Sequence, residues 1–309
     1  MTIRLANAPV SWGIWGANSL PAGRTPRDIL HALADAGYAG VELGPLGFFG
    51  ADAAAVSATL GEYGLACAGA YVPLRALEAA ELVEQDFAAL RVICKILLAF
   101  PNPGPVILAE ETYPELKRHL RRGNRHPELD LSASDWRRLI DTIKAAERIA
   151  TGYGLSVSFH PHTGTHIEQP HEVDRLLQEI DLGFTLDTGH AAAGGDDPLA
   201  LLARWGSRVN HIHLKDVHLA PIERASADNE EFGIARASAA LGAGDLDLDS
   251  FMQRLGQLNY SGWIVVEEDR RPDGGHDHAE VDREQRHNLD WVKARLGSLE
   301  RPFIINAGE

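Results

Sequence analysis

The sequence predicts a single α/β domain folded as a (β/α)8, or TIM, barrel. Short apolar segments rich in β-branched residues alternate with amphipathic helical segments along the whole chain, which is the pattern of a parallel sheet with helical crossovers. Eight strand-like segments in 309 residues fit a barrel of typical length. A doubly wound open sheet is the alternative, but no glycine-rich phosphate turn follows the first strand.

The expected strands are short runs bounded by glycine, proline or polar turns. They cover residues 3–8, 38–43, 65–71, 106–109, 155–160, 182–187, 209–214 and 262–267. Pro9 ends the first of them, because proline cannot donate a ladder hydrogen bond.

The helices expected between the strands carry apolar residues at helical spacing. They cover residues 26–36, 51–63, 77–100, 134–151, 171–180, 198–205, 248–258 and 279–296. Thr25, Pro26 and Gly37 have the residue types of an N-cap, a first helical position and a C′ position. Ser134 is expected to cap the helix that it begins.

Three segments depart from this alternation. Residues 218–245 form a long polar connection after the seventh strand, which is typical of a lid over an active site. The cationic cluster 118–125 is interpreted as a solvated helix end, with a loop that attracts an anionic substrate as the alternative. Residues 297–309 form a C-terminal tail that either docks or frays.

Composition narrows the class of partner. With 44 acidic and 29 basic residues, the formal net charge is -15, which repels phosphate backbones, so nucleic acid is not expected as a partner. No signal peptide and no run of about 18 apolar residues is seen, so no membrane span is expected. Cys67 and Cys94 form no CxxC pair, which fits a reducing cytoplasm. We expect a cytoplasmic enzyme with a small-molecule substrate, and the sequence leaves homo-oligomerisation open.

Residues able to bind a metal or move a proton follow three consecutive strands. His160 and His162 end the fifth strand, Asp187 ends the sixth, and His211 and His213 lie in the seventh. The C-terminal ends of barrel strands meet at one mouth, and a strand's period of two puts each histidine pair on one face. Imidazoles and carboxylates suit Mn, Co, Fe or Zn. The structural alternatives are histidines that pack the barrel mouth through hydrogen bonds, and Asp187 as a helix N-cap.

Four motifs resemble one known family. HPHTGT followed by IE, then DTGH, HIHLKDV and GWIVVEED, are similar to the sugar isomerase/epimerase superfamily of xylose isomerase-like barrels. DTGH and HLKD are shared across that superfamily, whereas HPHxGT is closer to its inosose (2-keto-myo-inositol) dehydratase branch. The resemblance covers most of the chain.

The resemblance implies a divalent metal held by residues from strands five to eight. The matching positions are Glu168, Asp187, His213 and Glu267. Strand five ends without a carboxylate, so Glu168 is the nearest candidate there, and a histidine ligand is the alternative. Glu267 and Glu268 point to opposite faces of an extended strand, so only one of them can serve, and the resemblance to the family selects Glu267. Mn or Co is the expected metal, with Mg, Fe or Zn as alternatives.

Other site residues are expected in two roles. Those expected to line the substrate cavity are Glu42, His190 and Trp12. Glu42 has an alternative role, pairing with a cation below the mouth. Those expected to transfer protons are His160, His162 and Lys215, with His162 in one role and Lys215 or His160 in the other.

The expected function is that of a metal-dependent lyase that dehydrates 2-keto-myo-inositol, another keto-cyclitol or a related keto-sugar, a polyhydroxy ketone in each case. When a metal stabilises the enediolate, the proton α to the carbonyl becomes removable and a β-hydroxyl can leave. A ketose isomerase or epimerase, in which the proton returns to the sugar, is the alternative. A non-catalytic sugar-binding barrel is disfavoured because it needs no ligands at four strand ends. The acidic charge disfavours a DNA-repair phosphodiesterase.

Overall fold

The computed structural model describes residues 2–16, 24–271, 277–298 and 303–304. Its parallel sheet closes into a barrel, because β10 pairs with both β7 and β1. The barrel strands are β1 (Ile3–Asn7), β2 (Gly40–Glu42), β3 (Ala66–Leu74), β4 (Val106–Glu110), β5 (Val157–Phe159), β6 (Gly183–Asp187), β7 (Val209–Leu214) and β10 (Gly262–Val266). The predicted eight-stranded barrel is therefore confirmed.

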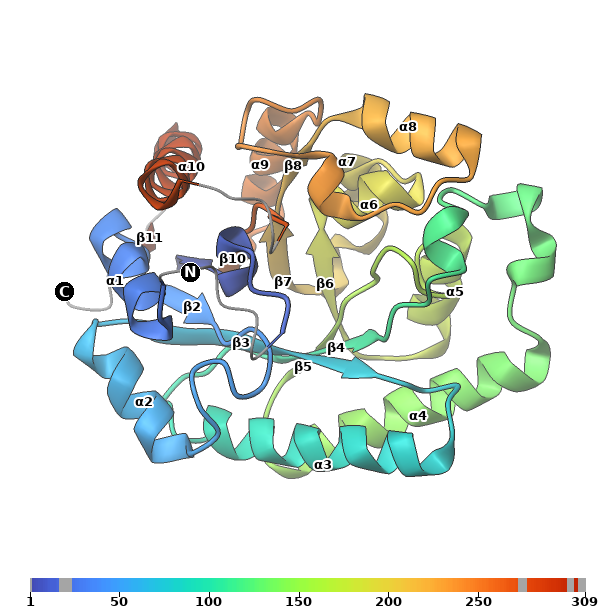
Figure 1. Cartoon of the computed structure of the whole chain (residues 1–309), viewed down its shortest axis with the longest axis horizontal. Helices are drawn as coiled ribbons and strands as arrows, with labels where there is room; N and C mark the ends of the chain where they lie inside the picture. The colour runs from blue at the N-terminus through green and yellow to red at the C-terminus, as the bar shows by residue number, and fades with distance from the viewer. Residues whose placement is uncertain (1, 17–23, 272–276, 299–302, 305–309) are drawn as a thin grey trace.

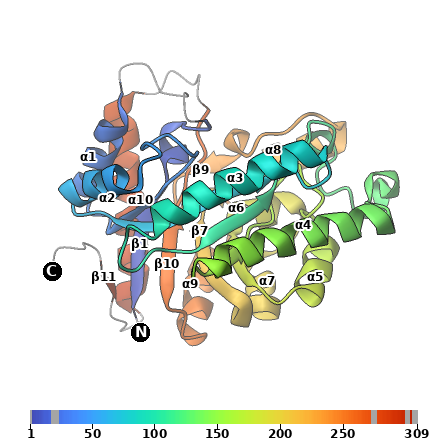
Figure 2. The same ribbon diagram turned by 90° about the horizontal axis from the view of Figure 1, so that it is seen from below.

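Helices surround this barrel (Figures 1 and 2). They are α1 (Pro26–Ala36), α2 (Ala53–Glu62), α3 (Ala80–Leu97), α4 (Ala133–Gly152), α5 (Pro170–Glu179), α6 (Thr188–Gly194), α7 (Pro198–Trp205), α8 (Leu219–Asp228), α9 (Leu248–Gln257) and α10 (His278–Ser298). None of the helices in the described ranges is long and apolar enough to cross a lipid bilayer.

Helix ends follow the expected chemistry with one exception. Thr25 caps α1 in a capping box with Asp28, and Gly37 ends that helix in the left-handed conformation (φ 96°). The prediction that Ser134 caps α4 is wrong, because Ser132 does so by accepting from the backbone N–H of Asp135. Ser132 directly precedes the first helical residue, Ala133. From that position its hydroxyl can reach the unpaired N–H groups of the first turn.

One continuous apolar cluster joins the barrel to its helices. Leu5, Leu108 and Ile212 on strands and Leu33 and Leu139 on helices belong to it, and all five are fully buried. Such close packing fixes the position of each strand, and therefore of the polar residues at the strand ends.

The long polar connection after β7 is a folded element. It contains α8 and the strand β9 (Ser238–Ala239), which pairs antiparallel with β8 (Asp216–Val217). Ile222 and Phe232 pack with Leu120 of the cationic segment in a small apolar cluster of their own. Figure 1 shows α8 beside α6, which is packed against it.

The cationic cluster 118–125 contains both exposed and buried arginines. Arg122 is fully buried and pairs with Glu172, while Arg121 and Arg125 donate to the backbone carbonyls of Ala192 and Ser226. Arg118 and Arg125 are exposed and end short 3-10 helices, in agreement with a solvated helix end. The contacts of Arg121, Arg122 and Arg125 with α6, α5 and α8 show that the segment is not a free cationic loop.

Part of the C-terminal tail docks on the barrel. Phe303–Ile304 forms β11, which pairs with Ile3 and Arg4 of β1. The rest of the expected tail beyond residue 298 lies outside the described residues.

Candidate metal centre

Buried acidic and imidazole side chains from five strands gather at the C-terminal end of the barrel. Glu42 ends β2, Asp187 ends β6, His213 lies near the end of β7, and His160 and Glu267 directly follow β5 and β10. Catalytic groups of such barrels lie at this end.

Asp187 has both roles that its sequence position allowed. Its Oδ1 accepts from the backbone N–H of His190 at 2.8 Å and so caps α6. Its Oδ2 lies 3.4 Å from His160 Nε2 and 3.5 Å from His213 Nδ1. This second oxygen is buried without a hydrogen-bond partner among the described residues, so capping does not use it, and Lys215 Nζ lies 3.2 Å from it.

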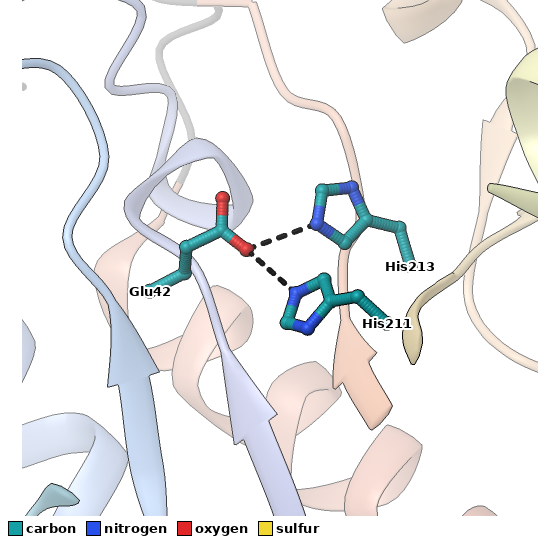
Figure 3. Close-up of side chains that lie close together, drawn as sticks. All are labelled: Glu42, His211 and His213. Carbon is teal, nitrogen blue, oxygen red and sulfur yellow. Dashed lines mark hydrogen bonds and ion pairs between the residues drawn. The ribbon is translucent and has the colours of Figure 1, made fainter. Parts of the chain in front are cut away.

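Glu42 orients the two histidines of β7 (Figure 3). Its Oε2 lies 2.9 Å from His213 Nε2 and 3.1 Å from His211 Nε2. When these ring nitrogens donate to the carboxylate, His213 Nδ1 faces Asp187 and Glu267, whose Oε2 is 3.4 Å away, and this nitrogen offers a lone pair to a metal only after it has lost its proton. A carboxylate behind a histidine in this way is the usual support of a metal ligand. Glu42 therefore contacts two histidines. This agrees with the alternative role expected for it, in which it pairs with a cation below the mouth of the barrel.

His160 presents one nitrogen to the same group. Its Nδ1 lies 2.7 Å from the carbonyl oxygen of Pro161 and can only donate there. In the neutral ring Nε2 then carries the lone pair, and this is the nitrogen that faces Asp187.

These donors fit a divalent metal. Ligand atoms about 2.1 Å from a tetrahedral metal lie about 3.4 Å from one another. The ligand atoms of His160, Asp187 and His213 all lie within 4.8 Å of one another, with closest distances of 3.4 and 3.5 Å. Glu267 approaches this group through His213, whose Nδ1 is 3.4 Å from its Oε2. Asp187 Oδ2 and His213 Nδ1 are both buried without a hydrogen-bond partner among the described residues. Two carboxylates and two imidazoles suit zinc, manganese, cobalt or iron.

A second group, Glu42 with His211 and His213, also brings three donors together. Its shared atom, Glu42 Oε2, already accepts from both rings. The carboxylate oxygen of Glu42 is therefore satisfied without a metal, whereas His211 Nδ1 and His213 Nδ1 are buried without a hydrogen-bond partner among the described residues.

Glu168 lies in a different environment from the one expected for a strand-five ligand. Its Oε2 accepts from the backbone N–H of Gly164 at 2.8 Å and lies 3.5 Å from Arg122 Nη1. Burial raises the pKa of Glu168 to about 8, although Arg122 opposes that shift. The residue that lies beside Asp187 and His213 is His160, and not Glu168. The loop after β5 turns back on itself, and the carboxylate of Glu168 pairs with Arg122 instead.

Lys215 lies among three carboxylates beside the donor group. Its Nζ is 2.7 Å from Asp269 Oδ2, 3.0 Å from Glu267 Oε2 and 3.2 Å from Asp187 Oδ2. Glu268, between Glu267 and Asp269, instead accepts from Gln285 and Asn288 of α10. The strand's alternation therefore continues past the end of β10.

His162 and His190 stack next to this group. Their ring centroids are 3.9 Å apart, and His160 lies 5.5 Å from His162 and 5.4 Å from His190. His162 Nδ1 lies 2.9 Å from the carbonyl oxygen of Thr163 and donates to it, so Nε2 is its free acceptor. Trp12 is directed elsewhere, because its indole N–H donates to Asp282 of α10 at 2.9 Å.

The charges shift the pKa values in opposite directions. Burial lowers the pKa of His213, but Glu267 and Glu42 outweigh it and raise that pKa well above its ordinary value. Burial raises the pKa of Glu42, but His213 and His211 hold it below the usual range. Burial and the neighbouring His160 lower the pKa of His162 to about 3, so that ring is neutral near pH 7.

Sequence reasoning missed some of these residues. Asp269 could have been found, because the period of two that separates Glu267 from Glu268 also places Asp269 on the side of Glu267. Arg122 carries no such signal, since nothing in a cationic run distinguishes the one member that is buried.

The sequence matches the xylose isomerase-like TIM barrel family over residues 30–295. The chain belongs to this family. Among relatives in it, an inosose dehydratase of Geobacillus kaustophilus is 29% identical over 287 residues, covering 88% of this chain and 89% of the relative. The rhizopine catabolism protein MocC of Rhizobium meliloti is 32% identical over 289 residues, covering 89% of this chain and 84% of that protein.

Solved structures share the barrel at lower identity. A D-allulose 3-epimerase from Methylomonas sp. superposes with a TM-score of 0.68 at 18% identity, covering 95% of this chain and 98% of that one. The IolI protein with a bound zinc atom gives a TM-score of 0.69 at 14% identity, covering 94% of this chain and 98% of that one. At these identities the superpositions establish the family's fold.

Proposed function

We propose that this chain is a metal-dependent lyase that dehydrates 2-keto-myo-inositol or a closely related keto-cyclitol. The observation that carries the proposal is the buried group of His160, Asp187, His213 and Glu267 at the barrel mouth, with Lys215 and His162 beside it. The names of the inosose dehydratase relatives support the substrate class.

The metal ligands proposed are those four residues, with His160 in place of Glu168. The zinc in the IolI neighbour supports a divalent ion, and the donors would equally accept the manganese or cobalt expected from the sequence. When bound there, the ion acts as a Lewis acid toward the keto oxygen and stabilises negative charge that develops on it.

The protein's own side chains supply the two proton transfers of an elimination. The neutral His162, with its free Nε2, takes the proton from the carbon next to the ketone, and the electron pair forms a carbon–carbon double bond. The ammonium of Lys215 gives a proton to the hydroxyl that leaves the adjacent carbon, so the products are water and an unsaturated ketone. Glu42 keeps His213 oriented throughout, and Arg122 and Glu168 hold the loop that carries His162.

A ketose isomerase or epimerase is the second candidate. The structural neighbour named a D-allulose 3-epimerase supports this candidate, since it shares the barrel fold. In this case the abstracted proton returns to carbon and no water is lost.

One experiment separates the two. The protein, reconstituted with zinc, manganese or cobalt, is incubated in deuterium oxide with 2-keto-myo-inositol and, separately, with ketoses. The proposal predicts an ultraviolet-absorbing unsaturated ketone from the cyclitol. Deuterium in recovered ketoses, without any unsaturated product from a keto-cyclitol or keto-sugar, would establish the second candidate instead.

A further inference from the structure

Lys215 and the donor group share two carboxylates. Asp187 and Glu267 each lie within 3.2 Å of Lys215 Nζ, and the same oxygens face His213 Nδ1 at 3.5 and 3.4 Å. These two oxygens would hold a divalent ion, and they also neutralise the ammonium of Lys215. The ion and the ammonium therefore need the same negative charge.

Two cations this close repel each other strongly in a buried site. The Coulomb energy between charges a few ångströms apart is several-fold larger there than in water. Lys215 is 2% exposed, so solvent cannot screen it. Lys215 and the metal therefore compete for Asp187 and Glu267, unless another anion binds the ammonium of Lys215.

Asp269 has the position of that anion. Its Oδ2 makes the shortest of the three contacts to Lys215 Nζ, at 2.7 Å. It is 4% exposed, and it has no contact with His213 or His160 in the donor group of the described structure. Asp269 therefore contacts the lysine without belonging to the metal ligands.

We propose that Asp269 is a positioning residue that holds Lys215 Nζ when Asp187 and Glu267 bind the metal. The inference rests on the proposed metal site. Through this contact Asp269 lowers the competition between the ammonium and the metal, and keeps the proton-donating lysine next to the substrate.

A double-mutant cycle on metal affinity tests this with the full-length chain. Zn²⁺ affinity is measured by competition with a chromophoric chelator for the unchanged protein, Lys215→Met, Asp269→Asn and the double variant. Lys215→Met keeps the length of the side chain without the charge, and we expect it to bind Zn²⁺ about tenfold more tightly. Asp269→Asn should bind it about tenfold more weakly, because the ammonium then stays on Asp187 and Glu267.

The double variant decides the cause. If Asp269 acts through Lys215, adding Asp269→Asn to the Lys215→Met variant should change its Zn²⁺ affinity by less than about twofold. If Asp269 only contributes negative charge or structural support, the same loss appears in both backgrounds, and the inference is wrong. Glu268→Gln is the matched control, since it removes a buried carboxylate one residue away that faces α10, and its Zn²⁺ affinity should be unchanged.

The outcomes also separate this inference from the proposed function. Unchanged protein that binds no Zn²⁺, Mn²⁺ or Co²⁺ contradicts both. Protein that binds metal but shows equal effects of Asp269→Asn in the two backgrounds contradicts only the role of Asp269. Circular dichroism of each variant establishes that the fold is kept.

Discussion

His213 Nε2 lies 2.9 Å from Oε2 of Glu42, which ends a strand on the other side of β1 and β10 in the closed barrel. The contact turns Nδ1 of His213 toward Asp187 and Glu267. A residue of β2 therefore determines which nitrogen of a β7 histidine is offered to the candidate metal centre.

Replacing Glu42 should weaken metal binding without removing a ligand. We expect Glu42→Gln to lower the Zn²⁺ affinity about 10–100-fold, because the amide orients His213 less strongly than the carboxylate does. Chelator competition measures this. Glu110→Gln is the matched control, since Glu110 ends β4, is 1% exposed and pairs with His166 outside the donor group. Equal losses in both variants would count against the orienting role.

The strand-five ligand can be assigned by two variants. His160→Ala should lose most of the bound metal, because His160 Nε2 is the nitrogen that faces Asp187. Glu168→Gln should keep it, since that carboxylate contacts Arg122 and Gly164 instead. Metal content after gel filtration, measured by plasma emission, gives the answer. The reverse result would restore Glu168 as the ligand and exclude His160.

Arg122 should matter for stability far more than the other arginines of its segment. It is fully buried between Glu168 and Glu172, so Arg122→Met leaves two buried carboxylates without their cation. We expect a loss of about 3–5 kcal/mol in the free energy of unfolding by urea. Arg118→Met, in an exposed pair with Glu231, should cost less than about 1 kcal/mol. If the two variants lose similar amounts of unfolding free energy, burial of Arg122 between the two carboxylates does not make it more important for stability than the exposed Arg118.

The connection 218–245 should resist proteolysis before any substrate is added. Its apolar cluster is already formed, with Phe232 at 1% exposed. Phe232→Ala should speed cleavage within this segment, whereas Glu230→Ala, at an exposed position, should not. Mass spectrometry of the fragments locates the cleavage sites. Rapid cleavage of the unchanged protein that slows only with 2-keto-myo-inositol would show a lid that orders over the substrate.

The sequence predicted what depends on local pattern. Strand periodicity located β7 at residues 209–214 and placed Asp187 at the end of β6, and alternation along the chain separated Glu267 from Glu268. Contacts between distant segments were not predictable in this way. The pairing of Arg122 with Glu168 joins positions 46 residues apart through a buried charge, and no local pattern shows which carboxylate a buried arginine will reach.

The metal content of Asp187→Asn and His213→Ala tests the central claim most directly. Both side chains lie at strand ends outside the apolar cluster, so the variants should keep the circular dichroism spectrum of the unchanged protein. Purified without chelator, the unchanged protein should carry about one divalent metal per chain, and each variant should carry almost none. If both variants keep the metal at the level of the unchanged protein, the candidate metal centre is not where we place it.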